Sequence, residues 1–205
     1  MLNVLAPPAT PSPDGRAARS ERTRAAVVDA ALALIEEGDL RPTAARVASR
    51  AGVALRTVFL HFQDMELLYV TAAGHQYGRM ASLLTPAPAD GSLDRRIAAF
   101  VAHRARLLEA ITPVRRAALL IEPFSDALAS RLRATRAGAQ RDVERVFDAE
   151  LRALTDGERR EVLAALTMAT AWPAWESLRA HQQLGTRQAR AVMARTVRAL
   201  LKREE

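Results

Sequence analysis

Cysteine is missing from the 205-residue sequence, which excludes disulfides, thiol nucleophiles and zinc sites built on cysteine. Aromatic residues make up only 4% of the chain, so its apolar mass is mostly alanine, leucine and valine. Alanine and leucine are strong helix formers, and this composition favours an α-helical fold. No apolar run approaches the roughly 20 residues of a membrane-spanning helix, so we expect no membrane partner.

Lysine is also nearly missing, because Lys202 is the single lysine among 30 basic residues. The formal net charge of +7 favours attraction to phosphate, but its distribution does not locate a site. Residues 16–80 hold nine arginines against seven acids, whereas residues 81–205 hold 21 basic residues against 15 acids. The first residues lack the basic and then apolar pattern of a signal peptide, so we expect a cytoplasmic protein.

Catalytic motifs are equally scarce. The four histidines, His61, His75, His103 and His181, show no metal-ligand spacing, and no cysteine can assist them. The sequence contains neither a glycine-rich phosphate loop nor a nucleophile elbow. We therefore expect no enzyme activity, no metal site and no cofactor.

Apolar residues recur at spacings of three and four along most of the chain, and no stretch alternates with the period of two of a strand. The predicted N-terminal helices cover about residues 20–38, 43–51 and 55–61, with a fourth beginning near residue 64. The predicted C-terminal helices cover about residues 93–111, ending before Pro113, residues 114–121, residues 128–154, residues 162–185 with a kink near Pro173, and residues 186–200 with Thr186 as the cap.

This pattern predicts an all-α fold of about nine helices. An N-terminal three-helix domain with a helix-turn-helix (residues 19–64) is followed by a connecting helix and loop (65–88) and a helical bundle (89–205). Four prolines within residues 1–15 predict a disordered tail over residues 1–18. An alternative interpretation of this tail is an arm that places Arg16 and Arg19 in the minor groove of DNA.

A helix-turn-helix sets two helices at a steep angle, so that the second can enter the major groove of DNA. Residues 43–62 fit this requirement, because Gly52 can adopt the positive φ of the turn at little cost. Ala48, Val53 and Val58 would supply the small core that fixes the angle. Many helical hairpins match such a pattern, so the turn alone does not establish DNA binding.

A more specific signal is the order of short motifs along this segment. Ala51-Gly52-Val53 is followed by Thr57-Val58-Phe59, then His61-Phe62, then Glu66-Leu67-Leu68, and together they resemble the signature of TetR-family transcriptional repressors. The resemblance covers about residues 20–70, and a less specific likeness continues in Trp172–Arg179 and the closing helix. It implies a ligand-responsive repressor that binds a palindromic operator as a dimer and is released by a small effector.

The resemblance also implies roles for individual residues. Thr43 and the backbone beside it would hold phosphate, and Arg56 and Thr57 would reach base edges, where arginine suits guanine. Leu60 would touch a thymine methyl group. His61 would contact phosphate, although a capping or packing histidine is the alternative. The implied DNA-binding set is Thr43, Ala54, Leu55, Arg56, Thr57, Phe59, Leu60 and His61.

Three residues depart from the family pattern. Ala54 replaces the usual serine cap of the recognition helix, Phe59 replaces a tyrosine, and Met65 replaces a common phosphate-binding lysine. We expect these changes to weaken salt-dependent DNA binding without abolishing it. They also keep open an alternative function, that of a helical ligand-binding or scaffold protein that has lost specific DNA binding.

In the family the C-terminal domain binds a small effector and dimerises through its last two helices, so we expect a homodimer and a hydrophobic or amphipathic effector. Arg104 lies one turn after Phe100 on an apolar face, and it either pairs with an anionic ligand or extends to solvent. Apolar residues at helical spacing also build ordinary cores, which is the alternative for each pocket residue. The candidate pocket residues are Phe100, His103, Arg104, Leu107, Phe124, Phe147, Met168 and Trp172. The candidate dimer residues are Ala165, Ala169, Val192, Met193, Thr196 and Val197.

Overall fold

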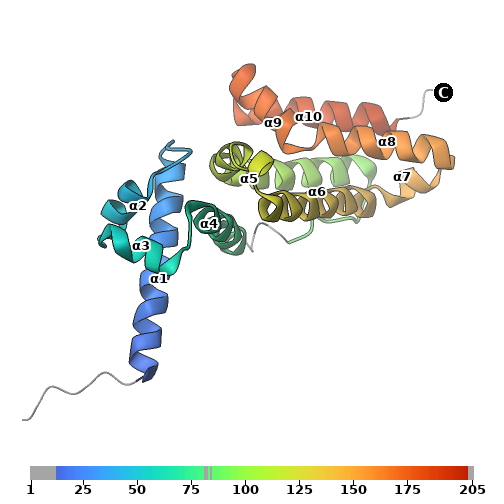
Figure 1. The fold of residues 1–205 in the computed structure, drawn as a ribbon. Helices are drawn as coiled ribbons and strands as arrows, with labels where there is room; N and C mark the ends of the chain where they lie inside the picture. The colour runs from blue at the N-terminus through green and yellow to red at the C-terminus, as the bar shows by residue number, and fades with distance from the viewer. Residues whose placement is uncertain (1–12, 81–82, 84, 203–205) are drawn as a thin grey trace, which may run out of the picture. The chain divides into compact units, whose positions relative to one another are not determined.

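A computed structural model describes residues 13–80, 83 and 85–202, and all regular structure within these residues is helical (Figure 1). The described residues form ten α-helices and no strand, which confirms the all-α prediction. None of the described helices is both long and apolar enough to cross a membrane. The chain divides into two compact units, with the boundary between Ala72 and Ala73.

The first unit contains α1 (Pro13–Glu36), α2 (Ala44–Ala51), α3 (Leu55–His61) and the first half of α4 (Met65–Arg79). The second half of α1 packs against α2 and α3, where Val27, Ala31 and Leu32 are fully buried. These side chains recur at helical spacing, so their burial fixes the face that α1 turns to its neighbours.

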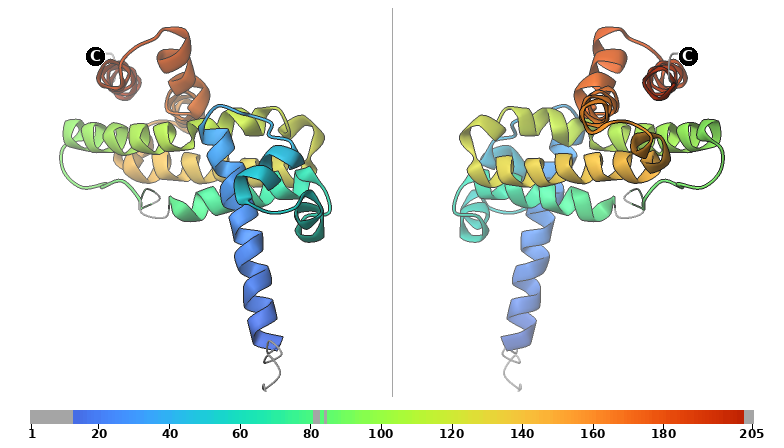
Figure 2. Two further views of the ribbon diagram at one scale, coloured as in Figure 1. Left: turned by 90° about the vertical axis from the view of Figure 1, so that its left-hand side faces the viewer. Right: turned by 90° about the vertical axis from the view of Figure 1, so that its right-hand side faces the viewer.

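Helix α1 begins earlier than the sequence predicts. Residues 13–18 are helical rather than part of a tail, while residues 1–12 lie outside the described residues. Proline is tolerated in the first helical turn, because that turn's N–H groups have no partner inside the helix. The first half of α1 runs beyond α2 and α3, and residues 15–22 are exposed (Figure 2). Arg16 and Arg19 therefore lie on a helix about 10 Å wide, too wide for the roughly 6 Å minor groove of B-DNA.

The second unit is a bundle whose core joins α5, α6, α8 and α10, and α8 and α10 lie on one side of α5 and α6 (Figure 1). A 3₁₀ turn (Glu122–Phe124) connects α5 to α6, and a π-helical turn (Ser177–His181) follows α9. The helices that follow α4 in this unit are α5 (Leu93–Leu119), α6 (Asp126–Val146), α7 (Asp148–Arg152), α8 (Asp156–Ala169), α9 (Trp172–Glu176) and α10 (Thr186–Leu201).

Helix α5 continues through Pro113, where the sequence predicted one helix to end and another to begin. A proline inside a helix removes one hydrogen bond and costs about 3 kcal/mol. Buried residues on both sides of it, among them Leu108 and Ala117, bind α5 to the rest of the unit and offset that cost. The hydroxyl of Thr112 also donates to the carbonyl of Leu108 at 2.7 Å, so the polar side chain finds a partner in the helix.

Two predicted helices are interrupted instead. The helix expected over residues 128–154 breaks at Phe147, which has φ −112° and ψ 24° and separates α6 from α7. The helix expected over residues 162–185 ends at Ala169, and Pro173 lies in the first turn of α9 rather than at a kink. Pro173 fits the first turn of a helix, whereas Phe147 forms no side-chain capping bond at the start of α7. The prediction of continuous helices was wrong at these two places.

The N-terminus of α10 also differs from the prediction. Thr186 is the first residue of the helix, and the residue before it, Gly185, takes the capping position. The side chain of Gln188 accepts a hydrogen bond from the Gly185 N–H at 3.2 Å, which satisfies a donor at this helix end.

Candidate nucleic-acid interface

The turn between α2 and α3 is closed by Gly52, which adopts the left-handed conformation with φ 67° and ψ 31°. The next residue, Val53, donates its N–H to the carbonyl of Ala48 at 3.0 Å, and this bond ends α2. Ala48 and Val58 are buried beneath the turn. Only glycine enters the left-handed region without strain, so this position sets the angle between the two helices.

Helix α3 carries its core contact on one side and its exposed residues on the other. Val58 is 1% exposed, and Phe62, directly after the helix, is fully buried beneath the guanidinium of Arg24, which lies 5.0 Å from its ring centroid. Arg56 is exposed and makes no ion pair within the described residues, so its guanidinium is available to a ligand. Thr57 and His61 are half-buried at the edges of this exposed face.

The N-terminus of α2 is capped by Thr43. The Thr43 hydroxyl accepts a hydrogen bond from the N–H of Arg46 at 3.3 Å, while Thr43 itself stays exposed. A threonine hydroxyl that accepts one bond can still donate another, and the other N–H groups of the first turn face outward from the helix end. Such an end attracts anions through its free donors and its dipole.

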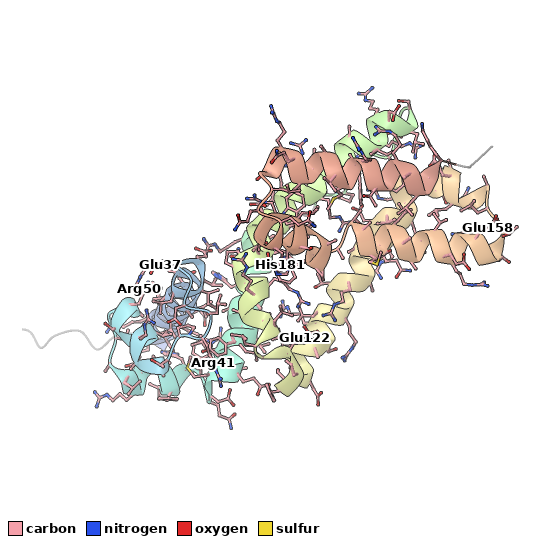
Figure 3. The ribbon with its side chains drawn as sticks, turned by 90° about the horizontal axis from the view of Figure 1, so that it is seen from above. Glu37, Arg41, Arg50, Glu122, Glu158 and His181 are labelled. Atoms are coloured by element: carbon pink, nitrogen blue, oxygen red, sulfur yellow. The ribbon has the colours of Figure 1, made fainter. Side chains whose placement is uncertain are left out.

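Sequence reasoning missed two ion pairs near the surface of this unit. Arg50 donates two hydrogen bonds to the carboxylate of Glu37, one of them 2.9 Å from Nη1 to Oε2, and these bonds lower the pKa of Glu37. Arg46 lies 2.7 Å from Asp39 (Nη1 to Oδ2). Figure 3 shows Arg50 and Glu37 side by side, with Arg41 on another side of the unit. Both paired arginines are thus partly neutralised, which periodicity alone cannot reveal.

A second missed contact fixes α4. The Tyr69 hydroxyl donates to the carbonyl of Pro42 at 2.7 Å, and burial raises the pKa of this tyrosine. The bond joins α4 to the loop just before Thr43, so it steadies the N-terminus of α2. The sequence signal for this contact was the hydroxyl group of Tyr69 among the apolar residues of α4.

In the second unit, only some of the candidate pocket residues lie together. Phe100 and Phe147 are fully buried with their ring centroids 5.3 Å apart, and Trp172 is nearly buried in the same cluster. His103 and Leu107 are half-buried on α5. By contrast, Phe124 is 84% exposed and Met168 is 70% exposed, so neither lines the interior of this unit. Helical spacing places a residue on a helix face but does not reveal which faces remain uncovered.

Arg104 does not extend to solvent, because it is only 4% exposed. Its guanidinium lies 4.9 Å from the Phe100 ring centroid, and Nη2 donates to the carbonyl of Ala139 at 3.2 Å and to Asp142 at 3.4 Å. The Nε–H has no hydrogen-bond partner among the described residues, and desolvation lowers the pKa of the group. A buried cation with one long ion pair and a free donor is costly for the fold and is only partly satisfied.

The candidate dimer residues fall into two groups. Met193 and Val197 are buried in the core, where α10 packs on α5 and α8, so the prediction that they face a partner was wrong. Val192 and Thr196 are exposed on the same helix, and Ala165 and Ala169 of α8 are half-buried. The buried residues of α10 recur at every fourth position. The sequence alone could not show that this apolar stripe packs in the core of its own chain rather than against a partner chain.

Two further polar clusters join helices in this unit. The buried Arg96 and the half-buried Glu150 form an ion pair between α5 and α7, and the bonds donated by Arg96 lower the pKa of Glu150. Glu109 accepts from Arg179 at 2.7 Å and from the Trp175 indole at 2.8 Å. Within the described residues no group of three or more histidine, aspartate or glutamate side chains is placed to hold a metal ion.

Comparison with known proteins agrees with this geometry. Residues 27–71 match the family model of bacterial regulatory proteins of the tetR family. No curated protein matches the sequence. A transcriptional regulator from Rhodococcus sp. Rha1 has a similar structure, with a TM-score of 0.65 and 19% identity over 89% of this chain and 95% of that one. A proposed TetR-family transcriptional regulator from Mesorhizobium loti MAFF303099 gives a TM-score of 0.62 and 18% identity, over 89% of this chain and 96% of that one.

At these identities the two solved structures show a shared fold. The family match covers the helix-turn-helix itself, including Gly52 and all of α3. Residues 27–71 in the first unit therefore match the helix-turn-helix domain of bacterial regulatory proteins of the tetR family, and the chain as a whole shares its fold with solved transcriptional regulators.

Proposed function

We propose that the chain is a repressor that binds a palindromic operator as a homodimer and is released by a small effector. The observation that carries the DNA-reading part is the outward face of α3, where Arg56 is exposed and has no ion pair within the described residues. Arginine suits the two acceptors of guanine in the major groove, and Thr57 lies next to it. Such a regulator acts where the DNA is, which in bacteria is the cytoplasm.

The phosphate contacts that we propose are fewer than in a typical member of the family. Thr43 and the first turn of α2 offer neutral donors, and His61 lies at the end of α3. Phe59 has no hydroxyl and Met65 has no charge, so these positions add nothing to phosphate binding. Since each neutralised phosphate steepens the salt dependence, we expect a shallow dependence of affinity on salt.

The proposed homodimer uses α8 and α10 from each chain. Val192 is 40% exposed and Met168 is 70% exposed, and these are apolar side chains that a partner helix pair would cover. Two DNA-binding domains related by a two-fold axis are needed to read the two halves of a palindrome. An interface that supports such a dimer typically buries upwards of about 1,200 Å² in total.

The proposed effector is an amphipathic molecule with one anionic or polar group, bound within the second unit. The support for an anion is Arg104, whose buried Nε–H lacks a hydrogen-bond partner within the described part of the chain and whose ion pair with Asp142 is long. Phe100, Phe147 and Trp172 supply the apolar surroundings. Release from DNA requires that the effector bind the DNA-competent and DNA-incompetent arrangements with different affinities.

A second candidate is a ligand-binding or scaffold protein without specific DNA binding. The observation that favours it is the N-terminus of α3, where Ala54 forms no side-chain capping bond. Selection from a pool of random duplexes at low salt separates the two functions. Enrichment of one palindromic sequence supports the repressor, and an unchanged pool contradicts it in favour of the scaffold.

A further inference from the structure

Helix α2 carries an arginine next to its proposed phosphate-binding end. Arg46 lies three residues after Thr43, and residues at this spacing are neighbours on one face of a helix. The side chain of Arg46 is 60% exposed, so its guanidinium is open to solvent. A phosphate held by Thr43 and the first turn of α2 would therefore lie within reach of this long, charged side chain.

The charge of Arg46 is already compensated within the protein. Its Nη1 lies 2.7 Å from Oδ2 of Asp39, whose side chain is only 19% exposed. Partly buried charges are screened less by salt than exposed charges are, so this attraction persists in solution. Oδ2 accepts no well-directed hydrogen bond within the described residues, and the contact is therefore held by opposite charge rather than by directed bonds.

The backbone fixes the position of Asp39. This residue follows Gly38, which has a φ of 99°, and its N–H donates to the carbonyl of Leu34 at 2.9 Å. The other carboxylate oxygen, Oδ1, accepts from the N–H of Arg41 at 3.4 Å. Because the carboxylate is anchored beside the end of α1, it cannot follow the guanidinium outward. Arg46 can bind a phosphate only by leaving Asp39.

We propose that Asp39 withholds Arg46 from the DNA backbone and thereby limits the affinity of the chain for DNA of any sequence. The inference rests on the proposed function, because it needs the N-terminus of α2 against a phosphate. It adds an internal anion that competes with DNA for one arginine of each chain. Phosphate contacts carry no sequence information, so withholding one reduces binding to the large excess of nonspecific DNA as well.

The other paired arginine of α2 offers a matched control. Arg50 donates two hydrogen bonds to Glu37 and lies at the C-terminal end of α2, about 6 Å beyond Arg46 along the helix axis. The helix dipole disfavours anions at that end. Glu37→Gln therefore removes one negative charge from the same unit without freeing a cation beside Thr43.

The main variant is Asp39→Asn, which keeps the Oδ1 acceptor for Arg41 but removes the charge that holds Arg46. We expect it to bind both the duplex that the random pool yields and an unrelated duplex of equal length about fivefold more tightly per chain, the upper end for an exposed ion pair. The slope of log affinity against log salt should steepen by about 0.9 per chain. Fluorescence anisotropy measures these affinities, and far-UV circular dichroism checks that the variant is folded.

Neutral phosphate substitutes then locate the new contact. Each phosphate of the selected duplex is replaced in turn, in both half-sites, by an uncharged methylphosphonate. We expect one position at which this replacement weakens binding about fivefold more per half-site for Asp39→Asn than for the wild type. Adding Arg46→Gln to Asp39→Asn should return that position to its wild-type sensitivity, and Glu37→Gln should leave it unchanged.

The possible failures are distinguishable. If the pool yields no preferred duplex, the proposed function fails and this inference fails with it. If a preferred duplex exists but Asp39→Asn matches the wild type in affinity and in its sensitive phosphates, this inference alone is overturned. The same holds if Glu37→Gln makes the same phosphate more sensitive, because added charge rather than Arg46 would then explain the gain.

A second variant tests the inference even if Asp39→Asn does not fold. Arg46→Gln alone should leave the set of sensitive phosphates as it is in the wild type, because a withheld arginine contacts none of them. A phosphate that loses its sensitivity in Arg46→Gln would show that Arg46 already binds DNA in the wild type, and would overturn the inference.

Discussion

At the scale of single residues, the outward face of α3 combines a charge with apolar side chains, and each has a separate expected role. Arg56 is exposed on the ridge of the helix, whereas His61 is half-buried at its end. A base contact changes the preference for one sequence over another, but a phosphate contact changes affinity for all sequences alike. Substitutions at these two positions therefore have different expected signatures.

Arg56→Ala should lower operator affinity by about 1–3 kcal/mol and relax the preference at one base pair in each half-site, since the bidentate contact to guanine is lost. His61→Ala serves as the comparison and should weaken matched and mismatched duplexes by the same factor. Titration of the operator and its single-base variants measures both effects. Equal weakening across all duplexes by Arg56→Ala would show that this arginine binds phosphate rather than a base.

At the scale of helices, the two ends of α2, which a cap and a turn set, were predictable, while the boundaries set by tertiary packing were not. Gly52 and Thr43 mark the ends of α2 through local chemistry, and both appear in the sequence as such. Pro113 signals a helix end, yet α5 continues because buried neighbours offset the lost bond. Phe147 carries no local signal for a break, so the division between α6 and α7 emerges only in the fold.

Ala54→Ser should stabilise the first unit by about 1 kcal/mol, because a serine hydroxyl can accept from the free N–H groups at the start of α3. Ala45→Ser, an exposed position inside α2, is the matched control and should give no gain, since serine is a poorer helix former than alanine. Urea unfolding followed by circular dichroism measures both variants. A gain from Ala45→Ser equal to that from Ala54→Ser would contradict the capping explanation.

The ion pair between Arg96 and Glu150 should make stability depend on pH. The pKa of Glu150 is lower in the folded chain, so the pair stabilises the fold above the unfolded pKa of about 4.3. This contribution is lost as the pH falls from that value through the lower folded pKa. Glu150→Gln should therefore be less stable than the wild type at pH 7, with a difference that narrows below about pH 4.3. Urea unfolding of both proteins across this pH range measures the difference in unfolding free energy. A difference that stays constant with pH would contradict the role given to this ion pair.

At the scale of the whole molecule, the family resemblance and the solved structures agree on the fold. Dimer formation and effector binding, in contrast, depend on surfaces that the structure of a single chain leaves uncovered. Met193 and Val197 show the limit of sequence reasoning, because their stripe serves the core of the chain itself. Phe124 and Met168 show the reverse, since both were assigned to an interior and both are exposed. The spacing of apolar residues in the sequence predicts the apolar faces of helices, but only the packing of the helices in the structure shows what covers each face.

Val192→Glu should dissociate the proposed dimer, because it would bury an unpaired charge twice at the contact between α10 helices. Leu119→Glu places the same charge at a residue of similar exposure on α5 and should leave assembly unchanged. Sedimentation at micromolar concentration should give twice the chain mass of 22.4 kDa for the wild type and the control, and about one chain mass for Val192→Glu. A wild type that sediments as a single chain would contradict the homodimer.

The most direct test of the central claim, that this chain reads a specific operator, is selection of binding sites from random duplexes by the purified full-length protein at low salt. The account predicts enrichment of a palindrome whose half-sites contain a guanine, and loss of that guanine preference with Arg56→Ala. A pool that stays random after repeated selection, or that gives the same enriched sequence with Arg56→Ala, would contradict it.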